Sequence, residues 1–328
     1  MRRREFILFA GGAVAAWPFA ARAQQGNRVR RVAALWPFTE DNPEAQTLFA
    51  ALRQGLREFG WTDIHIDSRW GGGNIARTQA YAAELVASAP DVIFAYFNSQ
   101  LAPLSRATRT IPIVFVGASD PVGAGYVASL AHPGGNITGF TLYEPSLAGK
   151  WLGALKEVAP KIVRVALMIN PDTAILHGTF YTQSFEDAAA ALGIEPVIAK
   201  VYSPADIETT IGSLGKQPGS GLMVAPDTFS EINGDLIVSL AAEHRVPAVF
   251  AIGRFAKRGG LMSYGPDTMA ALRRATGYLD RVLRGEKTAD LPVQAPTKFE
   301  LVVNLRAARA LGLTIAESFL LRADEVIE

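Results

Sequence analysis

Short polar residues that suit ligand contacts follow apolar segments at several places in the chain. They are Asn98, Ser99, Gln100, Ser119, Asp120, Asn170, Asp227 and Thr228. Where a helix begins directly after a strand, its free N–H groups and partial positive charge favour an anion. The same residue types also cap helices and form turns. Each position is therefore either a contact for a small ligand or a local structural residue.

Three places in the sequence allow more specific chemistry. Asn98-Ser99 is placed to receive a carboxylate, and ordinary helix capping is the alternative. Asp120 would accept a hydrogen bond from a ligand ammonium, or it caps the turn that Pro121 starts. Arg254, after the apolar stretch 246–252, would pair with a carboxylate if it faces a cleft, and solvent exposure is the alternative.

Aromatic residues stand at the ends of apolar segments or near expected hinges. They are Trp36, Phe38, Tyr143 and Tyr264. Flat side chains there suit an aromatic or apolar ligand, and packing within or between domains is the alternative. Together with the polar set, they predict a small organic ligand that carries a carboxylate.

The sequence does not predict a catalytic, metal or cofactor site. Gly71-Gly72-Gly73 lies between a predicted strand and a predicted helix but lacks the spacing and the Lys-Ser/Thr partner of a phosphate-binding loop. The four histidines show no metal-ligand spacing, and the chain has no cysteine. A Gly-x-Ser-x-Gly nucleophile motif is also missing from the sequence. We therefore expect a protein that is not an enzyme and needs no cofactor.

Alternating strands and helices are expected to position these residues. Strands are predicted at 29–36, 64–70, 91–97 and 111–117, and helices at 43–59, ending before Gly60, and at 78–88. Continuous apolar strands separated by helices indicate a parallel sheet that is covered on both faces.

The pattern then recurs at nearly one spacing. Segments 31–35, 56–60, 91–96 and 111–115 are echoed by segments 130 to 135 residues later. This domain-sized repeat predicts two similar Rossmann-like α/β lobes, at 28–142 and 146–264. Ligands bind beyond the carboxyl ends of parallel strands, so we expect a cleft between the lobes that closes by hinge motion. Segments 138–146 and 263–267 are the candidate hinges.

The first 23 residues have the composition of an export signal. Three arginines, at positions 2 to 4, precede an apolar stretch and the small-x-small site Ala21-Arg22-Ala23. Arg3-Arg4 also resembles the twin-arginine export motif, and a membrane anchor is the alternative to a cleaved signal. Because the chain has no cysteine, we expect a freely diffusing periplasmic protein and not a lipoprotein.

The composition of the remaining chain excludes one class of partner. Without residues 1–23 it has 28 Lys and Arg against 30 Asp and Glu, a net charge of about −2. A nearly neutral chain without a basic stripe argues against nucleic-acid binding. The hydrophobic content of 49% suffices for large cores that need no disulfides.

Several sequence blocks resemble a known family. They are the segments 111–115, 120–125 (Asp-Pro-Val-Gly-Ala-Gly), 133–139 (Pro-Gly-Gly-Asn-Ile-Thr-Gly), 298–305 and 321–327. In these blocks the chain resembles the periplasmic substrate-binding proteins of ABC transporters, in the group with tryptophan- and tyrosine-binding members. The resemblance implies the type I periplasmic-binding fold, in which the chain crosses between the lobes three times. Segments about 267–291 and 298–320 would then complete the first and second lobes.

The resemblance also implies partners and site roles. A permease and an ATPase in the inner membrane would be the partners of a monomeric binding protein. A small polar pair at Asn98-Ser99 would hold the ligand's carboxylate, and Asp227-Thr228 would face the cleft. The alternatives are an exported ligand sensor that docks on a membrane receptor, and an exported α/β enzyme.

Overall fold

The first sheet has five parallel strands, in the order β2-β1-β3-β4-β5. The computed structural model describes residues 29–328, so the predicted export signal lies outside the described residues. The strands of this sheet are β1 (Arg30–Trp36), β2 (Ile64–Trp70), β3 (Val92–Tyr96), β4 (Ile113–Val116) and β5 (Ile137–Phe140). The first four lie within the predicted strands. All but β2 are largely buried, whereas β2 at the edge of the sheet is only partly buried.

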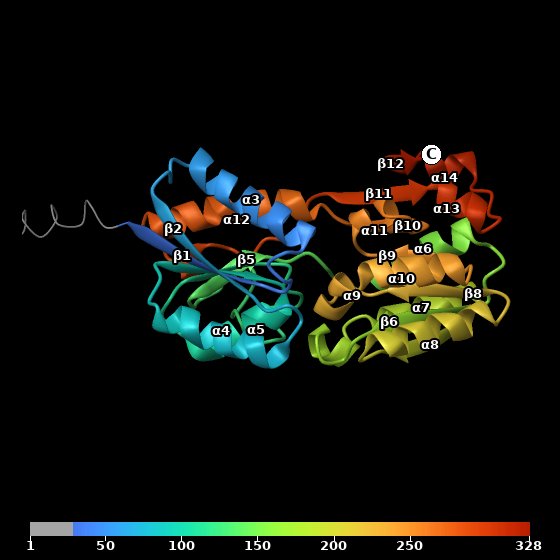
Figure 1. Cartoon of the computed structure of the whole chain (residues 1–328), viewed down its shortest axis with the longest axis horizontal. Helices are drawn as coiled ribbons and strands as arrows, with labels where there is room; N and C mark the ends of the chain where they lie inside the picture. Colours follow the sequence, from blue (N-terminus) through green and yellow to red (C-terminus); the bar gives the residue numbers. More distant parts are fainter. Residues whose placement is uncertain (1–28) are drawn as a thin grey trace, which may run out of the picture.

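Helices cover both faces of the first sheet (Figure 1). On one face lie α3 (Pro43–Glu58) and α12 (Thr268–Leu283), which pack against each other. On the other lie α4 (Ile75–Ala87) and α5 (Asn98–Ala107). Along β1, Val32 and Ala34 join the apolar cluster of the α3 side, whereas Ala33 joins that of the α4 side. This alternation explains why the strand is apolar throughout.

The second sheet has seven strands, in the order β12-β11-β10-β9-β8-β6-β7. They are β6 (Arg164–Ile169), β7 (Glu195–Lys200), β8 (Ser220–Val224), β9 (Ala248–Phe250), β10 (Met262–Pro266), β11 (Phe299–Asn304) and β12 (Glu325–Ile327). Its helices are α6 (Leu147–Val158), α7 (Thr182–Leu192), α8 (Pro204–Gly215), α9 (Thr228–Ile232), α10 (Gly234–Glu243), α11 (Gly253–Lys257), α13 (Leu305–Ala310) and α14 (Glu317–Leu320). Two short 3₁₀ helices are η2 (Ile175–Gly178) and η3 (Thr288–Asp290).

The second sheet departs from the expected parallel arrangement at one strand. β11 runs antiparallel to β10, with Tyr264 opposite Leu301. The chain reaches β11 on its return from the first lobe, so it enters the sheet from the cleft end instead of after a covering helix (Figure 1). The two lobes nevertheless have the Rossmann-like α/β architecture that the sequence predicts.

The chain passes between the two lobes three times. It leaves the first sheet after β5, returns between β10 and α12, and leaves again between Gln294 and β11. Gln294 marks the end of the returned segment, because it still pairs with Phe140 of the first sheet. Within residues 29–328, no helix has the length and apolar character needed to cross a membrane.

Candidate functional site

A pocket of about 400 Å³ lies between the lobes, where the carboxyl ends of both sets of parallel strands meet. Both sheets reverse their strand order here, between β1 and β3 and between β6 and β8. Such reversals are where open α/β sheets bind ligands. The pocket is lined by Gly73, Ile75, Thr78, Gln79, Asn98, Ser99, Gln100, Ala102, Pro103, Arg106, Ala124, Tyr126, Pro171, Asp172, Thr173, Ala174, Ile175, Leu176, His177 and Thr228.

The N-terminus of α5 points free donors at this pocket. Phe97 begins the helix with φ of 70°, and no side chain caps it. Gly117 makes room for this conformation, since a Cβ there would stand 2.5 Å from the Phe97 ring. Within the described part of the chain, the backbone N–H groups of Asn98, Ser99 and Gln100 have no acceptor. The helix therefore offers three N–H groups and its partial positive charge to an anion.

The side chains of this helix start also show an unfilled hydrogen-bonding position. The Asn98 Oδ1 atom is buried and has no partner within residues 29–328. The Ser99 hydroxyl donates to Gln100 Oε1 over 2.8 Å and lies 2.5 Å from the Thr228 hydroxyl of the other lobe. Because a buried acceptor without a donor is costly, Asn98 indicates a ligand group that donates.

In the second lobe, Asp227 positions Thr228. Its carboxylate accepts from Ser230 N over 2.7 Å, from Asn170 N over 3.0 Å and from Thr173 Oγ1 over 3.3 Å. Burial raises the pKa of Asp227 to about 6, and the hydrogen bonds from Ser230 and Asn170 act in the opposite direction. Asp227 is thus the N-cap of α9, and it holds Thr228 against Ser99.

Asn170 has a similar capping role one strand away. Its Oδ1 atom accepts from Asp172 N over 2.9 Å and from Thr173 N over 3.0 Å. This turn presents the segment that follows β6 to the pocket. Asn170 itself is buried and contributes no lining surface to the pocket.

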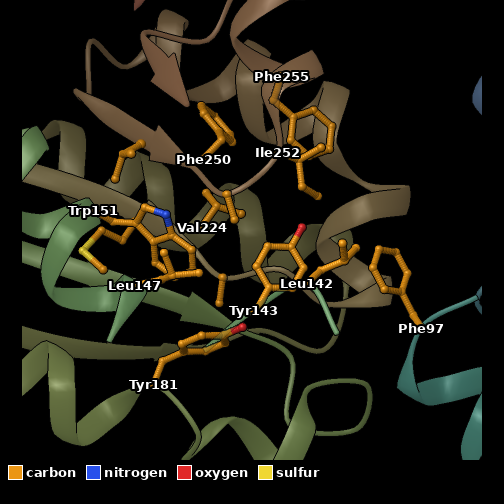
Figure 2. Packing of buried hydrophobic residues seen from close by; sticks show 14 of the residues in the cluster. Phe97, Leu142, Tyr143, Leu147, Trp151, Tyr181, Val224, Phe250, Ile252 and Phe255 are labelled. Carbon is orange, nitrogen blue, oxygen red and sulfur yellow. The ribbon is translucent and has the colours of Figure 1, made fainter. Parts of the chain in front are cut away.

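Three buried tyrosines, Tyr96, Tyr143 and Tyr181, lie near one another. Tyr96 ends β3. Tyr143 follows the first crossing and Tyr181 precedes α7 (Figure 2). Burial raises the pKa of all three phenols, and the Arg254 charge opposes this rise for Tyr96 and Tyr143. For Tyr181 the Ser119 hydroxyl opposes it. In the described residues, the Tyr96 hydroxyl has no hydrogen-bond partner.

Arg254 links the lobes at the edge of this cluster. It forms an ion pair with Glu231 of its own lobe, and its Nη1 atom lies 3.7 Å from Glu44 Oε1 of the first lobe. Its guanidinium carbon lies 4.7 Å from the centre of the Phe255 ring. Burial lowers the pKa of Arg254, and the Glu44 charge partly restores it. The carboxylates that Arg254 faces are therefore the protein's own.

The remaining sequence-predicted residues lie in other places. Trp36 and Phe38 are buried in the first lobe, where Trp36 stacks on Trp70 with ring centres 5.5 Å apart. Asp120 Oδ1 accepts from Gly123 N over 2.9 Å, which is the turn interaction. Tyr264 stacks on Phe299 at the outer surface of the second lobe, away from the pocket.

The structure brings Asn98, Ser99, Gln100 and Thr228 together around the pocket. Outside the pocket lining, a buried polar cluster includes four residues that the sequence did not predict as site residues: Glu44, Tyr96, Tyr181 and Glu231. In the sequence, Glu44 resembles an ordinary acidic residue in the first turn of a helix. Nothing near it in the sequence predicts its contact with Arg254. Among residues 29–328, no cluster of three or more His, Cys, Asp or Glu could hold a metal ion.

Comparison with known proteins identifies the family. Residues 41–327 match the family described as ABC transporter substrate binding protein. The chain belongs to this family. One relative with a similar sequence is the tyrosine-binding protein of Clostridioides difficile (strain R20291). It is 26% identical over 264 residues, which cover 79% of this chain and 75% of the relative.

Solved structures of similar proteins have the same fold as this substrate-binding protein. A conserved domain protein from Vibrio cholerae O1 biovar El Tor strain N16961 has a TM-score of 0.83 and 26% identity, covering 91% of this chain and 100% of that chain. An ABC domain from Streptococcus pneumoniae in complex with L-Trp also has a TM-score of 0.83. It is 24% identical and covers 92% of this chain and 100% of that chain.

Proposed function

We propose that this protein is the periplasmic solute-binding component of an ABC importer and captures a small organic carboxylate by closing its two lobes. The observation that carries the proposal is the uncapped start of α5 inside the pocket between the lobes. Its three free N–H groups, on Asn98, Ser99 and Gln100, match the acceptor-only character of a carboxylate.

Asn98 refines the chemistry of the solute. Since its buried Oδ1 atom needs a donor, the group next to the solute's carboxylate carries an N–H or O–H. An α-amino or α-hydroxy acid has both groups at the required proximity. The tyrosine named for the C. difficile relative and the L-Trp in the S. pneumoniae structure are amino acids, which supports this class.

Closure follows from the residues that meet across the cleft. In this structure Ser99 contacts Thr228, and a Cβ on Gly73 would stand 2.7 Å from the Ile232 side chain of the other lobe. A solute held by α5 and covered by the segment after β6 contacts both lobes at once, so it stabilises the closed arrangement over an open one. A permease and an ATPase would then receive the closed, monomeric protein. The site would carry out binding without catalysis.

The test is a thermal-shift screen of the protein comprising residues 24–328, refolded to remove bound solute. The compounds are amino acids, aromatic acids and short organic acids, each beside its amide. A solute at 100 times its dissociation constant adds about 2.7 kcal/mol to the free energy of unfolding, which raises Tm by several degrees. We expect hits among carboxylates, and no shift with the matching amides.

A double variant and a control variant test whether the Asn98 and Ser99 side chains contribute to solute binding. Asn98→Ala combined with Ser99→Ala should weaken the best carboxylate at least tenfold in calorimetric titration, because a buried acceptor and the interlobe hydroxyl are lost. Ser213→Ala, on the exposed surface of α8, is the control. Equal affinity of the double variant and the wild type would refute the solute contacts assigned to the Asn98 and Ser99 side chains.

A further inference from the structure

Two large apolar side chains at the pocket are exposed to water. Ile75, at the first residue of α4, is 48% exposed, and Leu176 of η2 is 46% exposed. They line the same pocket from different lobes. Exposed single apolar residues are common, but two that converge on one pocket from both sides form an apolar binding surface.

The backbone that presents Leu176 is itself in an unfavourable conformation. Leu176 and His177 both have left-handed backbone angles, with φ of 48° and 54°. This conformation is unfavourable for side chains larger than glycine and occurs mainly where the surroundings impose it. Here His177 Nδ1 lies 3.1 Å from Pro171 O, and the Thr179 hydroxyl donates to Leu176 O over 2.7 Å. The fold therefore keeps the apolar Leu176 side chain exposed. Packing within the protein does not compensate for its unfavourable backbone conformation.

The pocket has a polar and an apolar part. The free N–H groups of α5 and the buried Asn98 oxygen belong to its lining. Exposed polar and charged side chains also line the pocket, on Arg106, Asp172 and His177. Ile75 and Leu176 add an apolar surface to the same pocket.

We propose that Ile75 and Leu176 form a subsite for a hydrocarbon substituent of the solute and select for long or bulky apolar groups over short ones. The solute is then amphiphilic, with its carboxylate at α5 and its hydrocarbon part enclosed between the lobes. This inference rests on the proposed function, because the carboxylate fixes which end of the solute reaches the two residues. Solute binding would cover both exposed side chains and so favour closure.

The experiment uses straight-chain 2-amino acids of increasing length, from alanine through 2-aminobutanoate and 2-aminohexanoate to 2-aminooctanoate. Their affinities for refolded protein comprising residues 24–328 are measured by calorimetric titration. We expect the affinity to rise about fourfold for each added methylene, which corresponds to about 0.8 kcal/mol, until the pocket is filled. In Ile75→Ser combined with Leu176→Ser, the gain per methylene should fall at least by half while alanine binding stays unchanged.

Leu192→Ser is the matched control, because Leu192 is 38% exposed at the end of α7 and does not line the pocket. Failure of every carboxylate to bind would remove the proposed function and this subsite with it. Binding that is independent of chain length would overturn the subsite and leave the carboxylate site standing. An undiminished gain per methylene in the double variant would likewise overturn the roles of Ile75 and Leu176.

Discussion

The Arg254 guanidinium lies 3.7 Å from the Glu44 carboxylate, although the two residues belong to different lobes. Glu44 is fixed in the first turn of α3, where Asn42 caps the helix by accepting from Glu44 N. The two side chains are 15% and 22% exposed, so their attraction is screened less than that of a fully hydrated pair. The contact therefore stabilises the closed arrangement independently of the solute.

Replacing Glu44 should weaken solute binding through closure. In Glu44→Gln the interlobe attraction is lost, and a pair of this kind contributes about 0.5–1 kcal/mol. We expect the dissociation constant of the best carboxylate to rise about twofold to fivefold at low salt, and by less when salt screens the pair. Calorimetric titration at two salt concentrations measures the effect. Glu157→Gln is the control, since Glu157 pairs with Arg322 inside the second lobe, and a loss of equal size there would rule out an interlobe origin.

The pair between Arg254 and Glu231 should behave differently, because Glu231 is only 1% exposed. Arg254→Met leaves a buried carboxylate without its partner, which costs about 3–5 kcal/mol of the free energy of unfolding. Adding Glu231→Gln removes the buried charge and should recover most of that loss. Urea unfolding of both variants measures the difference. If the double variant is no more stable than Arg254→Met, desolvation of Glu231 is not the cause.

Local patterns in the sequence sufficed for most of the fold. Apolar runs gave the parallel strands, and Gly60, with φ of 92°, follows the end of α3 as expected. The antiparallel direction of β11 could not be predicted, because a strand's residues do not record from which side the chain enters the sheet. The apolar strand that ends at Trp36 is buried on both faces. Its sequence therefore does not indicate on which face the Trp36 side chain packs.

The site was predictable only where it depends on strand ends. Asn98, Ser99 and Thr228 follow strands directly, so their place at the carboxyl edge is a local property. Leu176 lies in an irregular segment with a left-handed backbone conformation. The residue types of this segment do not predict that conformation. Glu44 and Arg254 meet only after two lobes fold and close, and one sequence contains no pattern for such a contact.

Asp227 should make stability depend on pH. Burial raises its pKa from 3.8 to about 6, so the folded state holds the proton more tightly than the unfolded state. The stabilisation is full below the unfolded pKa and is lost as pH rises through about 6. Between about pH 4 and pH 7, the wild type should therefore lose about 2–3 kcal/mol relative to Asp227→Asn. Urea unfolding across this range tests the sign, and a constant difference would mean that burial does not raise the pKa.

Packing at the start of α10 should affect the position of Arg254 and therefore solute binding. A Cβ on Gly234 would stand 1.9 Å from the Phe255 ring, which lies under the Arg254 guanidinium. We expect Gly234→Ala to displace this ring and to lower the free energy of unfolding by about 1–3 kcal/mol.

The comparison variant is Gly153→Ala in α6, where nothing lies within 4 Å of the new Cβ. Alanine is the better helix former, so this change should raise the free energy of unfolding by up to about 1 kcal/mol. Because Arg254 contacts Glu44 across the cleft, Gly234→Ala should also weaken carboxylate binding, whereas Gly153→Ala should leave it unchanged. Unaltered binding in a destabilised Gly234→Ala protein would show that Phe255 supports the second lobe without positioning Arg254.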